Sequence, residues 1–385
     1  WSIISLRSNL SESVEHLSKG EFEKGLDAIK EVKVGIGQID GVIKSLDTFK
    51  QIGALNKQWQ AIQELSSLLK DVADGSEQAI LGTKELYESL KAVSGERQES
   101  PREYFDKAQA ELGLADFYLS KASASLKGET LQNLPFIKTQ ITELSKRIQI
   151  YSNLVKKSRA VVAILPQVVA IDGKSSYLLL LQNNAELRPT GGFIGSVAKV
   201  DFEGGKLKKL AVSDVYEIDG QLKLNVDPPK EIKSDLGVPR WFLRDSNWEP
   251  DFPTSARQAE WFYTKSTGSR VNGVVALDVS AMQGLLSVVG PIDLADYGES
   301  VSEDDLFEKA TTHAEQGFFP GSQAKKNFVT ALSTQLFNKI FFLPKQNWPA
   351  IVESLGKSFS GKHLMIYLSD PKLFSYLIVQ NWPGV

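Results

Sequence analysis

The chain has 385 residues, of which 42% are hydrophobic and 24% are charged, a balance typical of a folded globular protein. This length exceeds what a single hydrophobic core usually organises, so we expect two domains. The net charge of −3 creates no overall field that would attract nucleic acid or anionic lipid, and we therefore exclude nucleic-acid binding.

Rare and missing residue types exclude several kinds of chemical site. The chain has no cysteine, which excludes disulfides, thiolate metal ligands and cysteine nucleophiles. Its histidines, His16, His313 and His363, lie far apart without metal-ligand spacing, and we interpret them as unrelated surface or packing residues. The sequence has no GxSxG elbow, no Walker A loop and no apolar run of about 18 residues.

The first 165 residues have the apolar spacing of long helices. Apolar side chains recur at intervals of three and four, which is the seam of a helical bundle. The most regular row is Phe105, Ala108, Leu112, Ala115, Leu119, Ala122 and Leu126. Similar rows run from Ile29 to Leu46, from Leu55 to Val72 and from Ile137 to Val155. We expect residues 1–165 to form four main helices in an antiparallel bundle, preceded by a short helix and serving as a stalk or spacer.

The pattern changes at Pro166, where short apolar strands begin to alternate with helices. The predicted strands are 175–181, a hairpin of 193–202 and 206–212 around Gly204-Gly205, then 271–277 and 363–368. The predicted helices are 254–266 (with Ser255 and Gln258 as a capping box), 282–289, 303–313, 323–342, 349–355 and 372–380. Residues 166–385 are therefore predicted to form an α/β domain with a mixed sheet that helices cover.

Two polar segments interrupt this second domain and suggest a site. Residues 182–195 (QNNAELRPTGGFIG) follow directly on the first strand, and residues 244–253 (RDSNWEPDFP) have the same mixture of charged, amide and turn residues. Arg188 and Arg244 have the guanidinium geometry that binds phosphate through paired hydrogen bonds. Asp245 and Asp251 are carboxylates of the kind that hold Mg²⁺ beside phosphate oxygens. Structural ion pairs, Arg188 with Asp245 or Arg244 with Glu186, explain the same residues equally well.

Further polar residues of the two segments are candidate ligand-binding groups, and each has an alternative structural explanation. The set is Asn183, Asn184, Glu186, Thr190, Gly191, Gly192 and Asn247, with Lys325 and Lys326 from a later helix. The asparagines fit turns, the glycines fit either an anion-binding backbone nest or a tight turn, and the lysines fit a solvated helix start. Asp214 and Asp219, which follow the hairpin, are additional carboxylates near this site.

Three motifs resemble the signature of an uncharacterised bacterial envelope family, domain of unknown function 4012. They are residues 179–195 (LLLQNNAELRPTGGFIG), 244–253 (RDSNWEPDFP) and 271–278 (VNGVVALD) with Gly290-Pro291-Ile292 beyond. The resemblance implies exposure outside the cytoplasm and a transmembrane helix that precedes the bundle, outside the printed sequence. We therefore expect an extracytoplasmic protein that contacts the membrane only through that segment.

The order of elements is more distantly similar to the LytR-CpsA-Psr phosphotransferases, which attach pyrophosphate-linked glycopolymers to the cell wall. That similarity implies a LytR-CpsA-Psr-like fold and binding or transfer of a polyprenyl-pyrophosphate-linked glycan. Arg188, Arg244 and Asp245 would be the catalytic residues, with Mg²⁺ as cofactor on Asp245 and Asp251. The chain lacks that family's early aspartate after Arg188 and its late arginine near Lys325-Lys326. The alternative is a non-catalytic surface module in which the same motifs form a protein or glycan contact.

Overall fold

The structure, a computed structural model, describes residues 3–45, 56–128, 130–133, 138–184, 186–316, 324–341 and 343–384. The chain divides into two compact units, Trp1–Ala92 with Glu96–Pro166 and Val93–Gly95 with Gln167–Val385. Over the described residues, no helix combines the length and the apolar character that a membrane crossing requires.

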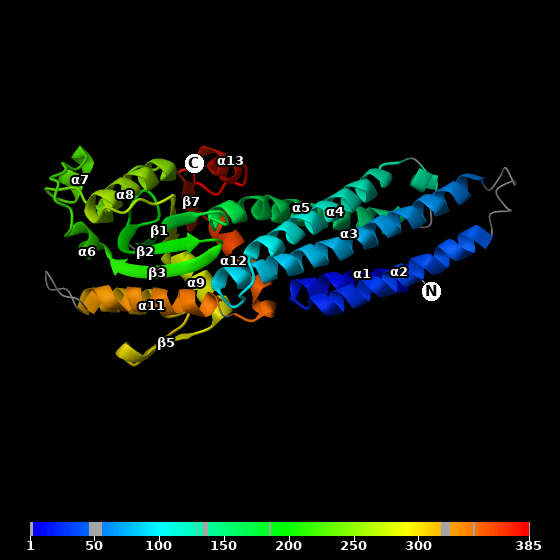
Figure 1. Cartoon of the computed structure of the whole chain (residues 1–385), viewed down its shortest axis with the longest axis horizontal. Coiled ribbons are helices and arrows are strands. Elements are labelled where there is room, and N and C mark those ends of the chain that lie inside the picture. Colours follow the sequence, from blue (N-terminus) through cyan, green and yellow to red (C-terminus); the bar gives the residue numbers. More distant parts are fainter. Residues whose placement is uncertain are drawn as a thin grey trace. The chain divides into compact units, whose positions relative to one another are not determined.

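The first unit is built from long helices, as the apolar spacing predicts (Figure 1). The helices are α1 (Ile3–Ser18), α2 (Phe22–Ser45), α3 (Asn56–Ser94), α4 (Pro101–Ser125) and α5 (Lys138–Val168), with a short 3₁₀ helix η2 (Thr130–Asn133) before α5. Neighbours run antiparallel, because early residues of one helix meet late residues of the next. For example, Lys121 near the end of α4 pairs with Asp71 of α3 at 2.8 Å. Leu112, which comes earlier in α4, lies against Gly82, which comes later in α3.

The predicted seam of α4 is its buried face. All seven apolar residues of that row, Phe105 to Leu126, are buried. Gly75 and Gly82 of α3 allow this close packing, because a β-carbon on either would lie within 3 Å of the side chain of Leu119 or Leu112. The helix begins where expected, with Ser100 as the N-cap and Pro101 in the first turn.

The predicted bundle differs from the structure at the end of its last helix, and three of its predicted seam residues fall outside the described residues. The helix α5 does not end before Pro166 but continues through it to Val168. Proline is tolerated there because only two residues of helix follow it, so few helical hydrogen bonds are affected. Three seam residues, Leu46, Leu55 and Ile137, lie outside the described residues.

The second unit contains a five-stranded mixed sheet with strand order β3-β2-β1-β4-β7. The strands are β1 (Lys174–Asn183), β2 (Phe193–Glu203), β3 (Lys206–Asp214), β4 (Gly273–Asp278) and β7 (Leu364–Leu368). Only β1 and β4 pair in parallel, with Leu178 opposite Val274, and all other pairs are antiparallel. A small two-stranded sheet of β5 (Ile292–Leu294) and β6 (Glu299–Val301) was not predicted.

Helices cover both faces of the sheet, which confirms the predicted α/β arrangement (Figure 1). On one face, Leu178 and Val274 pack with α8 (Phe252–Thr267) and α6 (Val215–Asp219). On the other face, Leu181 and Leu277 pack with α9, α11 and α12. The remaining helices are α7 (Lys230–Asp235), α9 (Val279–Val289), α10 (Leu306–Gln316), α11 (Ala324–Phe341), α12 (Trp348–Ser360) and α13 (Pro371–Val379), and the short 3₁₀ helices are η4 (Leu243–Asp245), η5 (Ala295–Tyr297) and η6 (Lys345–Asn347).

Local turn chemistry explains how β2 and β3 are joined and how α8 begins. Gly204 and Gly205 both have positive φ, as a two-residue hairpin turn requires. The predicted capping box of Ser255 and Gln258 is wrong, because the N-cap of α8 lies four residues before Ser255. Its N-cap is Asp251, whose carboxylate accepts from the backbone N–H of Thr254 at 2.9 Å.

Candidate functional site

The two polar segments meet beyond the end of β1, where residues 188–192 contact residues 245–247. The loop between β1 and β2 returns close to its own starting strand. A β-carbon on Gly192 would lie 2.1 Å from the carbonyl oxygen of Asn183, and one on Gly191 would lie 2.2 Å from Oε1 of Gln182. Both glycines have positive φ. They are therefore required by the backbone path of this loop.

A buried amide network fastens the loop to the second segment. Asn247 is fully buried, and its Nδ2 donates to the carbonyl oxygens of Thr190 at 2.8 Å and Gly192 at 2.7 Å. The hydroxyl of Thr190 donates to the carbonyl of Asn247 at 3.3 Å, and Nε2 of Gln182 donates to the carbonyl of Thr190 at 2.7 Å. Thr190, Gly192 and Asn247 are thus hydrogen-bonded to one another, and these contacts join the two segments.

Both arginines of the predicted site are held by buried carboxylates. Arg188 donates from Nε and Nη2 to Oδ1 of Asp245 at 3.2 and 2.9 Å. Arg244 donates from Nη1 to Oδ2 of Asp219 at 2.9 Å, and its Nε lies 3.6 Å from Oδ2 of Asp245. We call Arg188, Arg244, Asp219 and Asp245 the four-charge cluster. The Arg188–Asp245 pair considered from the sequence is present, and Arg244 pairs with Asp219, a partner that the sequence did not suggest.

The four-charge cluster is largely closed to solvent and electrically balanced. The side chains of Asp219 and Asp245 are each 4% exposed, and those of Arg188 and Arg244 are 11% and 19% exposed. Burial raises the pKa of the Asp219 carboxyl to about 6, and the charge of Arg244 limits this rise. At neutral pH two cations therefore face two anions, and the cluster has no net charge to attract phosphate.

Aromatic rings and backbone donors hold the cluster in place. The guanidinium of Arg244 lies 4.4 Å from the ring centre of Phe242 and 5.1 Å from that of Tyr216. The backbone N–H of Leu243 donates to Oδ1 of Asp219 at 2.9 Å, so both oxygens of this carboxylate are hydrogen-bonded. Because Asp219 ends α6, this contact ties α6 to the segment 241–251.

The two carboxylates expected to hold Mg²⁺ have different surroundings. Asp245 binds the arginines, whereas Asp251 is exposed and caps α8, with Oδ2 accepting from the backbone and hydroxyl of Thr254. Among the described residues there is no group of three or more histidine, aspartate or glutamate side chains placed to hold a metal ion. Mg²⁺ on Asp245 and Asp251 stays a prediction, because Mg²⁺ can be held by one or two carboxylates together with phosphate oxygens.

The remaining candidate residues lie outside the cluster. Asn184 donates from Nδ2 to Ser280 and Asp278. Asn183 pairs with Phe193 across β1 and β2, and the carbonyl of Glu186 accepts from the backbone of Phe193 at 2.9 Å. Lys325 and Lys326 are in the first turn of α11, and their side chains lie outside the described part. Asp214 caps α6.

Aromatic residues of the second segment pack into the core between the sheet and α8. Phe252 is fully buried among the residues between the sheet and α8. Trp241 packs edge-on against Phe262 of α8 at 5.3 Å and donates its indole N–H to the carbonyl of Asp245. These contacts anchor both ends of the segment 241–252, at Trp241 and Phe252, against the core.

Sequence reasoning missed a second polar cluster at the ends of the two parallel strands. Asp278 ends β4, and its Oδ2 lies 2.7 Å from Nδ1 of His363, which directly precedes β7. Its Oδ1 accepts from the backbone of Ala281 and so caps α9. The sequence predicts His363 to be a surface or packing residue, and no local spacing links it to Asp278. Only the antiparallel pairing of β4 and β7 places them together.

Comparison with known proteins identifies a family for this region. Residues 172–314 match the model of a family described as "Protein of unknown function (DUF4012)". The match includes both polar segments and β1 to β4. No protein with a curated description matches the chain.

Proposed function

We propose that this chain, whose residues 172–314 form a DUF4012 domain, is an extracytoplasmic, non-catalytic binding module of the bacterial cell envelope. The observation that supports this choice is the pairing of Arg188 and Arg244 with Asp245 and Asp219. A phosphotransferase needs guanidinium groups that are free to meet developing negative charge. Here a phosphate would have to displace two buried carboxylates that already occupy these groups.

The energetic argument favours a structural role for the cluster. Separating a buried ion pair costs about 3–5 kcal/mol, because it leaves an uncompensated charge in a low-dielectric site. Binding of a pyrophosphate would have to offset this cost twice, once for each carboxylate. The cluster and the Asn247 amide network instead fix the loop to the segment 241–251. The envelope location rests on the family likeness of the sequence motifs.

A rigid loop of this kind can present side chains to a partner. Leu187 is 85% exposed, although its neighbours Glu186 and Arg188 are held in place. The carbonyl of Glu186 accepts from Phe193, and the carbonyl of Leu187 accepts from Nη1 of Arg188 at 2.8 Å. An exposed leucine on a fixed backbone loses little conformational entropy on binding. We therefore propose that Leu187 is a contact residue for a protein partner in the envelope.

The second candidate is the phosphotransferase that the LytR-CpsA-Psr likeness implies, with a polyprenyl-pyrophosphate-linked glycan as substrate. It is favoured by the convergence of Arg188, Arg244 and Asp245 from two separate segments. This alternative requires Asp219 and Asp245 to release the arginines when substrate binds.

A thermal-shift experiment separates the two functions. The full chain is heated with geranylgeranyl pyrophosphate, with and without Mg²⁺, as wild type and as Arg244→Ala. The binding-module proposal predicts no ligand-dependent stabilisation of the wild type. A Mg²⁺-dependent rise in the melting temperature of the wild type that Arg244→Ala abolishes would support the phosphotransferase instead.

A photocrosslinking experiment tests the role of Leu187 directly. A benzoylphenylalanine is placed at position 187 or at position 379, another exposed apolar position, in cells that produce the protein. We expect a discrete adduct with one protein from position 187 and none from position 379. Identical adduct patterns at both positions, or no adduct at position 187, would refute a specific contact there.

A further inference from the structure

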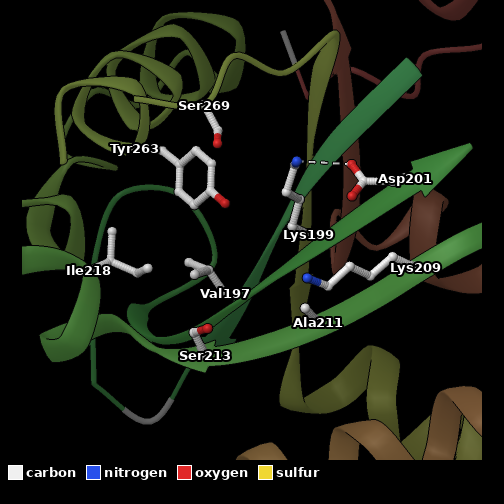
Figure 2. A pocket seen from close by; sticks show the side chains of 9 residues that line it. All are labelled: Val197, Lys199, Asp201, Lys209, Ala211, Ser213, Ile218, Tyr263 and Ser269. Atoms are coloured by element: carbon white, nitrogen blue, oxygen red, sulfur yellow. Dashed lines mark ion pairs between the residues drawn. The ribbon is translucent and has the colours of Figure 1, made fainter. Parts of the chain in front are cut away.

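A pocket of about 240 Å³ lies on the sheet, and none of its lining residues belongs to the four-charge cluster (Figure 2). Three cross-strand pairs of β2 and β3 form its floor. They are Val197 with Ser213, Lys199 with Ala211, and Asp201 with Lys209. Because side chains alternate along a strand, these six residues share one face of the sheet. It is the face on which Val197 packs with α6 and α8.

The walls of the pocket come from the helices that cover this face. Tyr263 of α8 directs its phenol toward the floor, and Ile218 of α6 and Ser269 after α8 border it (Figure 2). Most of the face beneath α8 is apolar, as expected for a covered sheet. The pocket is therefore a polar interruption in an otherwise apolar layer.

The charged residues on the floor are not explained by protection of the sheet edge. Charged side chains on an edge strand commonly prevent pairing with other chains, and this accounts for Lys209 on β3. Lys199 and Asp201 are on β2, however, which is paired on both sides. Their side chains are only 28% and 25% exposed, and partly burying these charges costs desolvation free energy. Protection of the sheet edge does not explain that cost, because β2 is not an edge strand.

The charges leave one cation available to a ligand. Lys199 lies 3.1 Å from Oδ1 of Asp201, and the hydroxyl of Ser176 donates to the same oxygen at 2.5 Å. Lys209 is exposed beside them, and the described residues give it no ion-pair partner. Two lysines and one aspartate give the pocket a net charge of +1. A single carboxylate balances this charge, whereas a phosphate dianion does not.

The other lining groups favour a ligand that is rich in hydroxyls. Ser213, Ser269 and the phenol of Tyr263 can each donate or accept a hydrogen bond. Val197, Ala211 and Ile218 offer an apolar surface for the C–H face of a ring. The volume is below the range of about 300–1,000 Å³ that drug-sized ligands occupy, so it fits one small ring.

We infer that the pocket between β2, β3 and α8 binds one residue of an acidic saccharide, with its carboxylate on Lys209 and its hydroxyls on the Asp201, Ser213 and Tyr263 side. This inference rests on the proposed function, a non-catalytic binding module. It adds to that function the chemical class of the ligand, an acidic glycan. It does not involve the four-charge cluster. The two proposals can therefore fail separately.

Isothermal titration of the full chain with D-glucuronate, D-glucose and inorganic phosphate tests the inference. We expect saturable binding of glucuronate and none of glucose or phosphate. The substitution Lys209→Glu should weaken glucuronate binding by about tenfold to a hundredfold, the effect of losing one charge-assisted hydrogen bond. Lys208→Glu is the control, because Lys208 is also exposed on the same strand but does not line the pocket.

Several results would overturn the inference. Absence of saturable glucuronate binding would remove the site, and phosphate binding in preference to glucuronate would remove the saccharide assignment. Equal weakening by Lys208→Glu and Lys209→Glu would indicate general surface charge. A second variant, Tyr263→Phe, keeps the packed ring and removes only the phenolic oxygen. It should weaken glucuronate binding, and unchanged affinity would contradict the proposed orientation. Pyrophosphate binding at the arginines would leave all of these outcomes unaffected.

Discussion

The substitution Gly192→Ala tests whether the loop between β1 and β2 depends on the close backbone approach described above. Gly192 has a φ of 101°, and an added β-carbon would lie 2.1 Å from the carbonyl oxygen of Asn183. Backbone strain of this kind costs about 1–3 kcal/mol. Because the contact is with backbone and not with a flexible side chain, the loop must also move. That movement weakens the 2.7 Å hydrogen bond from Asn247 to Gly192, worth about 1 kcal/mol.

We therefore expect Gly192→Ala to lower the free energy of unfolding by about 2–4 kcal/mol. The assay is guanidinium denaturation followed by tryptophan fluorescence, which reports mainly on the second unit because five of the seven tryptophans lie within residues 167–385. Gly195→Ala is the control, since an added β-carbon there meets nothing within 4 Å and the φ is not positive. A loss below about 0.5 kcal/mol, or equal losses in both variants, would refute the reasoning.

Two further predictions concern pH and the helical bundle. Since the pKa of Asp219 is raised to about 6 from its ordinary 3.8, its protonated form favours the folded state. This contribution is complete below about pH 4 and is lost as the pH rises through about 6, amounting to at most about 3 kcal/mol. Denaturation of wild type and Asp219→Asn between pH 4 and 7 should show a steeper loss of stability with rising pH in the wild type, and parallel curves would contradict this. In the bundle, Gly82→Ala should cost about 1–3 kcal/mol, because its β-carbon would lie 2.7 Å from Cγ of Leu112. Gly113→Ala, with nothing within 4 Å, should instead stabilise α4 by up to about 1 kcal/mol, and thermal denaturation that ranks the two variants in the opposite order would refute the packing argument.

The regular part of the fold was predictable because its signals are local. The row from Phe105 to Leu126 specifies a buried helix face through spacing alone, and Gly204-Gly205 specifies the hairpin turn that joins β2 and β3. The N-cap of α8 was misplaced because Asp251 and Ser255 are both residues that favour this position. Only the backbone path around Pro253 decides between them, and it places Asp251 at the helix start.

The contacts of the candidate site were predictable only in part. Arg188 and Asp245 were expected to be either ligand groups or an ion pair, and the structure pairs them. The partner of Arg244 depends on where α6 packs, which is decided by tertiary contacts and not by spacing in the sequence. The contact between Asp278 and His363 depends in the same way on strand order. The pocket beside Tyr263 depends on how much of the sheet α8 covers.

The central claim is that the four-charge cluster is neutralised internally and is therefore not a phosphate site. Asp245→Asn changes one carboxylate to an amide of similar size and leaves Arg188 and Arg244 with an excess positive charge. The most direct test is calorimetric titration of wild type and Asp245→Asn with inorganic pyrophosphate at low salt. The account predicts no saturable binding by the wild type and a newly acquired, salt-sensitive affinity in the variant. Saturable binding by the wild type that Asp245→Asn does not strengthen would contradict it.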